Sequence, residues 1–171
     1  MREFERILGV SLELAEVDLA EIQAVDTEEV CRAKAALAFA KVGDPVIVDD
    51  TGFELAALRG FPGALVTWVL EAGGLELLHR MLPAESAPIA TAVTCIGLAD
   101  ENGVQIFTGR VTGTVLSTPR GIGGFGFDPV FVPDGETSSL AEMKDADKDR
   151  HSPRGLALAK LAEFLGQRLA R

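Results

Sequence analysis

The sequence is poor in the residues that build metal centres and in the patterns that mark membrane proteins. Its two cysteines, Cys31 and Cys95, lack metal-ligand spacing, which favours buried, reduced thiols. Two histidines, His79 and His151, are too few for a multi-histidine zinc site. No apolar run reaches the roughly 18 residues of a membrane-spanning helix, and the opening segment MREFERILG is too charged to resemble a signal peptide. We therefore expect a cytoplasmic protein that does not enter a membrane.

Positively charged residues are also scarce. The chain has 16 Lys and Arg against 26 Asp and Glu, which gives a formal net charge of −10. Neutralising the phosphates of a nucleic acid or an anionic membrane requires an excess of cationic side chains, so this balance opposes both as partners. A small anionic ligand remains compatible, because it needs only a local cluster of cations.

Three common nucleotide and hydrolase motifs are missing or misleading. The chain has neither the phosphate-binding G-x-x-x-x-G-K-[ST] nor the nucleophile motif G-x-S-x-G. Gly121, Gly123 and Gly126 formally match the dinucleotide fingerprint G-x-G-x-x-G, but that fingerprint must open a helix. Asp128 and Pro129 follow instead and predict the start of a strand, so a Rossmann fold is excluded.

What the chain does contain indicates one globular domain over residues 1–171. Its 47% apolar and 25% charged residues are typical of a folded domain. Helix and strand patterns alternate, which predicts an α/β (mixed α+β) fold with helices packed on a sheet. We expect helices at residues 2–9, 27–42, 65–71, 75–82 and from 152 onward, and strands at 45–48, 90–98, 104–116 and 128–132. Thr27 can cap the second helix, and the turn Asp100-Glu101-Asn102-Gly103 joins the second and third strands.

The stretch VIVDDTGFEL places Asp49 and Asp50 directly after an apolar strand. Successive strand residues point to opposite faces, but at a strand end both carboxylates can reach one loop region. Carboxylates with waters and substrate phosphates suit Mg²⁺, and Glu28 or Glu29 in the first turn of the preceding helix can add a third acid. The alternative is that one aspartate caps the following Thr-Gly turn, the other is solvated, and the glutamates only favour the helix dipole.

The segment PRGIGGFGFDP sets Phe125 and Phe127 around Gly126. Glycine lets a backbone turn tightly or approach a ligand closely, and aromatic rings stack on planar bases with about 1–3 kcal/mol per base. The segment therefore indicates either a base-binding pocket or two core phenylalanines beside a turn.

The segment DADKDRHSPRG gathers Lys148, Arg150 and Arg154 in an otherwise acidic chain. Ser152 followed by Pro153 is typical of a helix start, and a helix N-terminus beside cations binds anions. A solvated charged surface is the alternative. Acids, an aromatic-glycine segment and a late cationic cluster together suit a nucleoside triphosphate with Mg²⁺.

Three motifs resemble one known family. VIVDDTGFELAALRGFPG, PRGIGGFGFDPVFVPDG and AEMKDADKDRHSPRGLALAKL are similar to the inosine triphosphatase, or Ham1-like, family, and the similarity runs in order from Met1 to about Leu161. The resemblance implies a long central mixed sheet with flanking helices in two lobes, a nucleotide cleft between them, and a homodimer. It also implies Mg²⁺-dependent hydrolysis of aberrant purine nucleoside triphosphates (ITP, dITP, XTP) to the monophosphate and pyrophosphate.

The same resemblance implies roles for individual residues. Asp50 matches the essential acid, a general base or metal ligand, while Asp49 and Glu29 match further Mg²⁺ ligands. The positions expected to contact the purine nucleotide are Thr51, Phe125, Gly126, Phe127, Asp128, Lys148, Ser152 and Arg154. In this scheme the segment 125–128 holds the base, and water attacks the α-phosphorus.

The sequence departs from the family pattern at several places. The opening strand and the Ser/Thr-x-Asn-x-x-Lys phosphate loop are not in this sequence, since MREFERILG resembles the helix after that loop. The family Ser-His-Arg is Ser152-Pro153-Arg154 here, and Asp149 follows Lys148 where asparagine is usual. Two alternatives to a fully active enzyme follow: a catalytically impaired nucleotide-binding homologue or scaffold dimer, or a natural polypeptide that begins further upstream.

Overall fold

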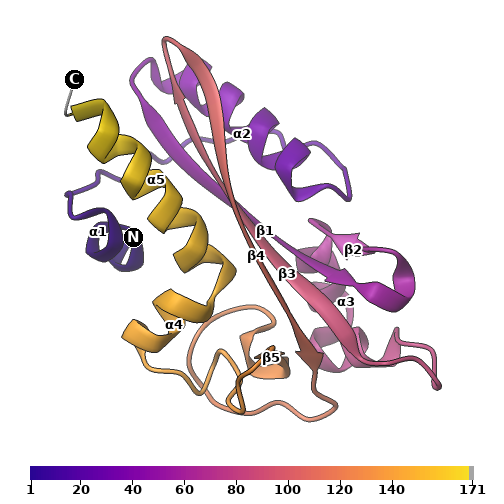
Figure 1. The fold of residues 1–171 in the computed structure, drawn as a ribbon. Helices are drawn as coiled ribbons and strands as arrows, with labels where there is room; N and C mark the ends of the chain where they lie inside the picture. The colour runs from indigo at the N-terminus through magenta and orange to yellow at the C-terminus, as the bar shows by residue number, and fades with distance from the viewer. Residues whose placement is uncertain (170–171) are drawn as a thin grey trace.

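The computed structural model describes residues 1–169 and confirms the predicted fold class, a sheet flanked by helices (Figure 1). The helices are α1 (Arg2–Leu8), α2 (Thr27–Val42), α3 (Val66–Arg80), α4 (Asp145–His151) and α5 (Pro153–Leu169), with short 3₁₀ helices at Ala56–Leu58 and Asp128–Val130. The strands are β1 (Val46–Leu55), β2 (Pro62–Gly63), β3 (Ile89–Asp100), β4 (Gly103–Val115) and β5 (Phe131–Pro133).

The five strands form one sheet in the order β2-β1-β3-β4-β5. It differs from the expected mixed sheet, because every ladder within residues 1–169 is antiparallel. Parallel neighbours need a long crossover connection, whereas β3 and β4 meet through the tight turn that the sequence predicted. Asp100 pairs with Gly103 across this turn, and the φ of 107° at Gly103 favours glycine.

Strand β1 is longer than expected. The predicted end at Val48 is wrong, because the ladder with β3 continues to Leu55. Thr51 and Gly52 therefore lie within the strand and form no turn. A Cβ at Gly52 would lie 2.1 Å from the Oγ1 of Thr27 in α2, so the strand can pass this close to the helix only with glycine there. The two adjacent aspartates consequently sit within strand β1, where it pairs with β3 alone.

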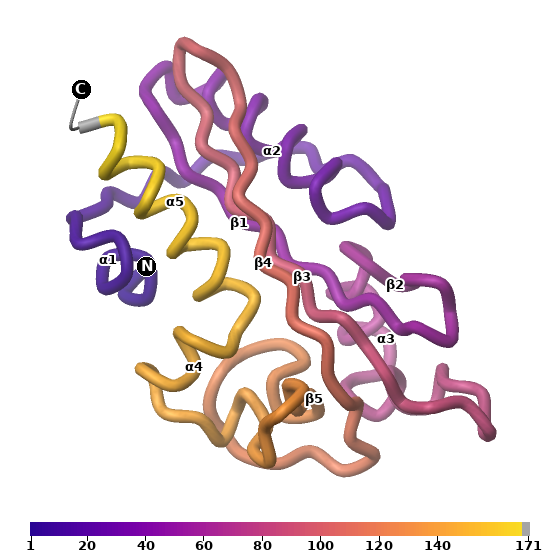
Figure 2. Tube along the Cα trace, viewed as in Figure 1, coloured from indigo at the N-terminus to yellow at the C-terminus, as the bar shows by residue number. Residues whose placement is uncertain are grey.

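Helices cover both faces of the long β1-β3-β4 strands. Helix α2 lies on one face, where Cys31 packs against Val93 and Cys95 of β3. The Cys31 thiol donates to the Cys95 carbonyl oxygen at 3.1 Å, and burial raises the pKa of Cys31 to about 12. Both thiols are free and buried, which confirms their predicted state. Helix α5 lies on the other face with α1 packed beside it (Figure 2).

The far end of the α5 face is covered by α3 and by the long segment between β4 and α4 (Figure 1). The buried apolar side chains at this end form a core cluster that includes Phe53 of β1 and Phe131 of β5, whose ring centroids lie 5.5 Å apart. The two helices expected at residues 65–71 and 75–82 are confirmed: α3 consists of two helical parts that meet at a kink at Gly74, where the backbone is non-helical with a φ of 66°. Within the described part of the chain, no helix has both the length and the hydropathy needed to cross a bilayer.

Gly109 of β4 sets how closely α5 approaches the sheet. A Cβ at this position would lie 1.9 Å from the carbonyl oxygen of Pro153, so a side chain here displaces the first turn of α5. We expect Gly109→Ala to lower the free energy of unfolding by about 1–3 kcal/mol, the usual effect of overpacking, as measured by chemical denaturation. Gly166→Ala in α5 is the matched control, because nothing lies within 4 Å of a Cβ there. Equal destabilisation by the two changes would contradict the packing argument.

Candidate active site

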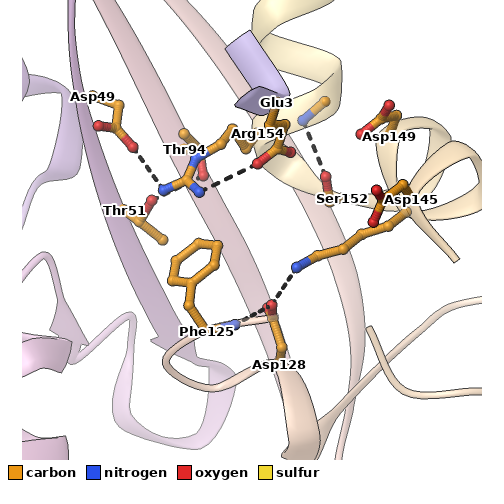
Figure 3. Close-up of polar contacts among 12 residues, drawn as sticks. Glu3, Asp49, Thr51, Thr94, Phe125, Asp128, Asp145, Asp149, Ser152 and Arg154 are labelled. Carbon is orange, nitrogen blue, oxygen red and sulfur yellow. Dashed lines mark hydrogen bonds and ion pairs between the residues drawn. The ribbon is translucent and has the colours of Figure 1, made fainter. Parts of the chain in front are cut away.

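Asp49 and Asp50 point to opposite faces of β1, as the alternation of a strand predicts. Asp49 faces α5, where its Oδ2 accepts a hydrogen bond from Arg154 Nη2 at 2.7 Å (Figure 3). Asp50 faces α2, where its Oδ2 lies 3.1 Å from the Nζ of Lys34. Because the acids lie inside the strand and not at its end, they do not converge on one loop.

Asp50 is the more deeply placed acid, with 11% of its side chain exposed. Its Oδ1 accepts a hydrogen bond from the backbone N–H of Thr51 at 2.9 Å. Its Oδ2 is buried and has no hydrogen-bond partner of good geometry among residues 1–169, although the Lys34 ammonium lies nearby. Burial raises the pKa of Asp50, and the charge of Lys34 opposes but does not cancel that rise. The site therefore holds a carboxylate oxygen that lacks a full complement of partners.

Lys34 is a site residue that the sequence analysis missed. Its Nζ lies 2.7 Å from Glu21 Oε1 and donates to the Asp49 carbonyl oxygen at 3.4 Å. Burial lowers the pKa of Lys34, but the hydrogen bond with Glu21 and the charge of Asp50 outweigh burial and raise it. The sequence position of Lys34 could have indicated this role. Lys34 follows the buried Val30 by four residues on the apolar stripe of a helix, and a lysine in such a place needs an acidic partner.

Arg154 stacks on Phe125 on the α5 side of the sheet. The guanidinium carbon lies 4.1 Å from the centroid of the Phe125 ring, within cation–π range. Arg154 is held from two sides, by Asp49 and by Glu3 of α1 at 3.4 Å (Figure 3). Glu3 is the second contact that the sequence analysis missed, because nothing in the sequence links α1 to α5.

Asp128 and Lys148 form a buried ion pair beside this stack. Asp128, with 2% of its side chain exposed, accepts from Lys148 Nζ at 2.5 Å and from the Phe125 N–H at 2.8 Å. A Cβ at Gly124 would lie 2.1 Å from Asp128 Oδ2, so the loop can wrap around this carboxylate only with glycine there. The pair fixes the loop that carries Phe125, and Gly126 adopts a φ of 54° within it.

The two phenylalanines of this loop have different environments, and the interpretation as a core residue is confirmed for Phe127 alone. Phe127 is buried in the core, with its ring centroid 4.3 Å from that of Phe53. Phe125 is 42% exposed and presents its ring to Arg154. Phe127 therefore supports the loop from the core, while base stacking on Phe125 stays a prediction.

Ser152 is buried and begins α5, as predicted from the Ser-Pro pair. Its Oγ accepts a hydrogen bond from the backbone N–H of Gly155 at 3.0 Å, which is the contact of a helix N-cap. A direct contact between Ser152 and a nucleotide stays a prediction. The capped helix start holds Arg154 two residues further along the chain, over Phe125 (Figure 3).

The residues brought together here line one small cavity. They are Glu3, Thr51, Thr94, Phe125, Phe127, Asp128, Leu140, Lys148, Ser152, Pro153 and Arg154. Its volume of about 10 Å³ holds roughly one water molecule, far less than a purine base. A base can therefore stack on Phe125 only after the Arg154 side chain or the loop moves aside.

Glu29 does not join this arrangement directly. Asp26, and not the expected Thr27, caps α2 by accepting from the backbone N–H groups of Glu28 and Glu29 at 2.8 and 3.0 Å. Glu28 pairs with Arg32 one turn later, and the side chain of Glu29 is exposed. Within residues 1–169 no three His, Cys, Asp or Glu side chains are grouped so as to hold a metal ion. The metal-binding role of Glu29 stays a prediction.

Comparison with known proteins identifies the family. Residues 1–164 match the model of the Ham1 family. The chain belongs to the Ham1 family. A relative from Thermococcus kodakarensis, a dITP/XTP pyrophosphatase, is 38% identical over 98% of this chain and 91% of its own length. An inosine triphosphate pyrophosphatase from Aspergillus oryzae is 39% identical over 97% of this chain and 88% of its own length.

Solved structures of Ham1 proteins share the fold. A HAM1 protein from Coxiella burnetii matches with a TM-score of 0.79 at 27% identity, over 97% of this chain and 92% of that one. A nucleoside-triphosphatase, or dITP/XTP pyrophosphatase, from Mycobacterium abscessus matches with a TM-score of 0.73 at 30% identity, over 96% of this chain and 93% of that one. The Ham1 family thus includes curated nucleoside-triphosphate pyrophosphatases that align with nearly the whole of this chain.

Proposed function

We propose that this chain hydrolyses non-canonical purine nucleoside triphosphates, namely ITP, dITP and XTP, to the monophosphate and pyrophosphate, with Mg²⁺ as cofactor. The observation that carries the proposal is the stack of Arg154 on the exposed ring of Phe125. The buried pair of Asp128 and Lys148 lies next to this stack, with Lys148 Nζ 5.1 Å from the Phe125 ring centroid. Asp49 binds the same arginine (Figure 3). The activities named for Ham1-family relatives support the same reaction.

Lys148 would select the base. An ammonium group has three N–H donors and no acceptor, and one donor of Lys148 is bonded to Asp128. A remaining donor can bind the keto oxygen at C6 of hypoxanthine or xanthine. Adenine carries an amino group there, and an unmatched buried polar group costs about 1–3 kcal/mol. The pair would therefore favour keto purines over adenine, with Phe125 as the stacking surface.

The carboxylates of β1 suit the cofactor. Mg²⁺ prefers oxygen ligands, and Asp50 offers a buried oxygen without a hydrogen-bond partner in the described chain. Asp50, on the α2 face of β1, would hold the ion, with Glu29 of α2 as a further proposed ligand. The side chain of Asp49 points to the α5 face and pairs with Arg154, so its proposed role as a ligand requires it to leave that arginine and turn toward the ion. Bound there, Mg²⁺ supplies charge neutralisation and Lewis acidity at the phosphoryl oxygens. Asp50 would also orient the water that attacks the α-phosphorus or accept its proton.

The test is to incubate the chain with Mg²⁺ and ITP, XTP or ATP and to measure pyrophosphate and monophosphate. We expect kcat/KM for ATP about 10- to 100-fold below that for ITP, from the cost of an unmatched polar group. Release of orthophosphate, or equal turnover of ATP and ITP, would contradict the proposal. Calorimetric binding of ITP without turnover would instead identify an impaired nucleotide-binding homologue.

The family resemblance also supports a cytoplasmic homodimer. Trp68 of α3 and Phe61 beside β2 are exposed, and exposed aromatic side chains are typical of protein interfaces. Light scattering on the purified chain measures its mass in solution, and a monomeric mass at micromolar concentration would contradict the dimer.

A further inference from the structure

Two threonine hydroxyl groups meet on the floor of the cavity beneath Arg154. Thr51 of β1 and Thr94 of β3 are directly opposite each other in the antiparallel ladder, and their Oγ1 atoms lie 3.1 Å apart. Both side chains line the cavity that Phe125 and Arg154 close. Thr51 is partly exposed, whereas Thr94 has 0% of its surface exposed.

Burial decides the direction of this hydrogen bond. Each hydroxyl has one proton to donate, and a buried donor left without an acceptor costs about 1–3 kcal/mol. Among the described residues, the Thr51 oxygen is the acceptor that the structure offers to the Thr94 hydroxyl. On distance alone either hydroxyl could donate, and the direction that leaves no buried donor unpaired is from Thr94 to Thr51 Oγ1. In that direction the Thr51 proton is free to bind an acceptor in the cavity.

We propose that Thr94 is a positioning residue that fixes the Thr51 hydroxyl as a hydrogen-bond donor to an acceptor oxygen of the bound nucleotide. Thr94 does not touch the ligand in this scheme. It holds one rotamer of Thr51 and prevents the Thr51 proton from turning inward. This inference rests on the proposed function, because it assumes that the nucleotide enters the cavity beside Phe125.

The test compares Thr94→Val, which keeps the shape of the side chain, with Thr94→Ser, which keeps the hydroxyl. We expect Thr94→Val to raise the KM for ITP about three- to tenfold with little change in kcat, the effect of losing one neutral hydrogen bond made in both ground and transition states. Thr94→Ser should stay within about twofold of the original chain, because it restores the donor.

Two further variants separate positioning from stability. Thr91→Val removes a similar hydroxyl pair, Thr91 with Thr112 at 3.4 Å, on the same strand but exposed and away from the cavity, so its KM should not change. In a Thr51→Val background, Thr94→Val should add no further rise in KM, since the hydroxyl that Thr94 positions is gone. A merely structural Thr94 would change the unfolding midpoint in both backgrounds and leave KM alone.

An unchanged KM in Thr94→Val, or a full additional effect in the Thr51→Val background, would overturn the inference while leaving the proposed function intact. If the unmodified chain binds ITP without turnover, the same comparisons are made on the Kd measured by calorimetry. Absence of any ITP binding by the unmodified chain would overturn both the proposed function and this inference.

Discussion

Asp50→Asn is expected to reduce pyrophosphate release from ITP by roughly 10²–10⁴-fold, the loss typical of removing a general acid–base group. The substitution keeps the size of the side chain. It removes the negative charge that faces Lys34 and replaces a buried oxygen that lacks a hydrogen-bond partner within residues 1–169. Steady-state kinetics with Mg²⁺ and ITP measure the change.

The fold should survive this substitution. Burial raises the pKa of Asp50, which means that the surroundings disfavour its charge, and a neutral amide fits them without that cost. Lys34 keeps a partner in Glu21 at 2.7 Å. Asp44→Asn is the matched control, because Asp44 is an exposed acid just before β1. Activity of Asp50→Asn equal to that of the control would contradict the role assigned to Asp50.

Lys148→Met is expected to lower the free energy of unfolding by about 3 kcal/mol, because it leaves the buried Asp128 carboxylate without its cation. Asp128 is 2% exposed and Lys148 14% exposed, so solvent cannot replace the lost partner. Urea denaturation followed by the fluorescence of the single tryptophan measures the change.

A charge on the same helix provides the control for this experiment. Arg150 of α4 pairs with Asp147, but both side chains are well exposed, so Arg150→Met should cost less than about 0.5 kcal/mol. Combining Lys148→Met with Asp128→Asn should recover part of the stability, since removing both charges is less costly than removing one. Equal effects of the two methionine variants would show that the Asp128–Lys148 pair is not a stabilising contact.

Local patterns in the sequence predicted those parts of the site that depend on neighbours in the chain. The Ser152-Pro153 pair predicted the start of α5, and the hairpin turn before Gly103 was predicted from its turn residues. The alternation of Asp49 and Asp50 across the strand followed from strand geometry alone. Each of these features is decided within a few residues.

Other features depend on contacts between distant segments and were not predictable from one sequence. Strand β1 continues through Thr51 and Gly52 because β3 supplies a full-length partner, and this tertiary pairing overrides the local turn preference of a Thr-Gly pair. Lys34 and Glu3 join the site from α2 and α1, which lie far from the loop of Phe125 in the sequence. Their roles became visible only once the helices were placed on the sheet.

The opposite orientation of the two aspartates links the two helical layers. Neighbouring α-carbons in a chain are about 3.8 Å apart, so the ion pair of Asp49 with Arg154 and that of Asp50 with Lys34 share one peptide unit. Both pairs are partly shielded from solvent, where salt screens charge poorly. A negative charge that binds near Arg154 on the α5 side therefore interacts electrostatically with the Asp50–Lys34 pair on the α2 side across a single strand. This interaction requires no conformational change.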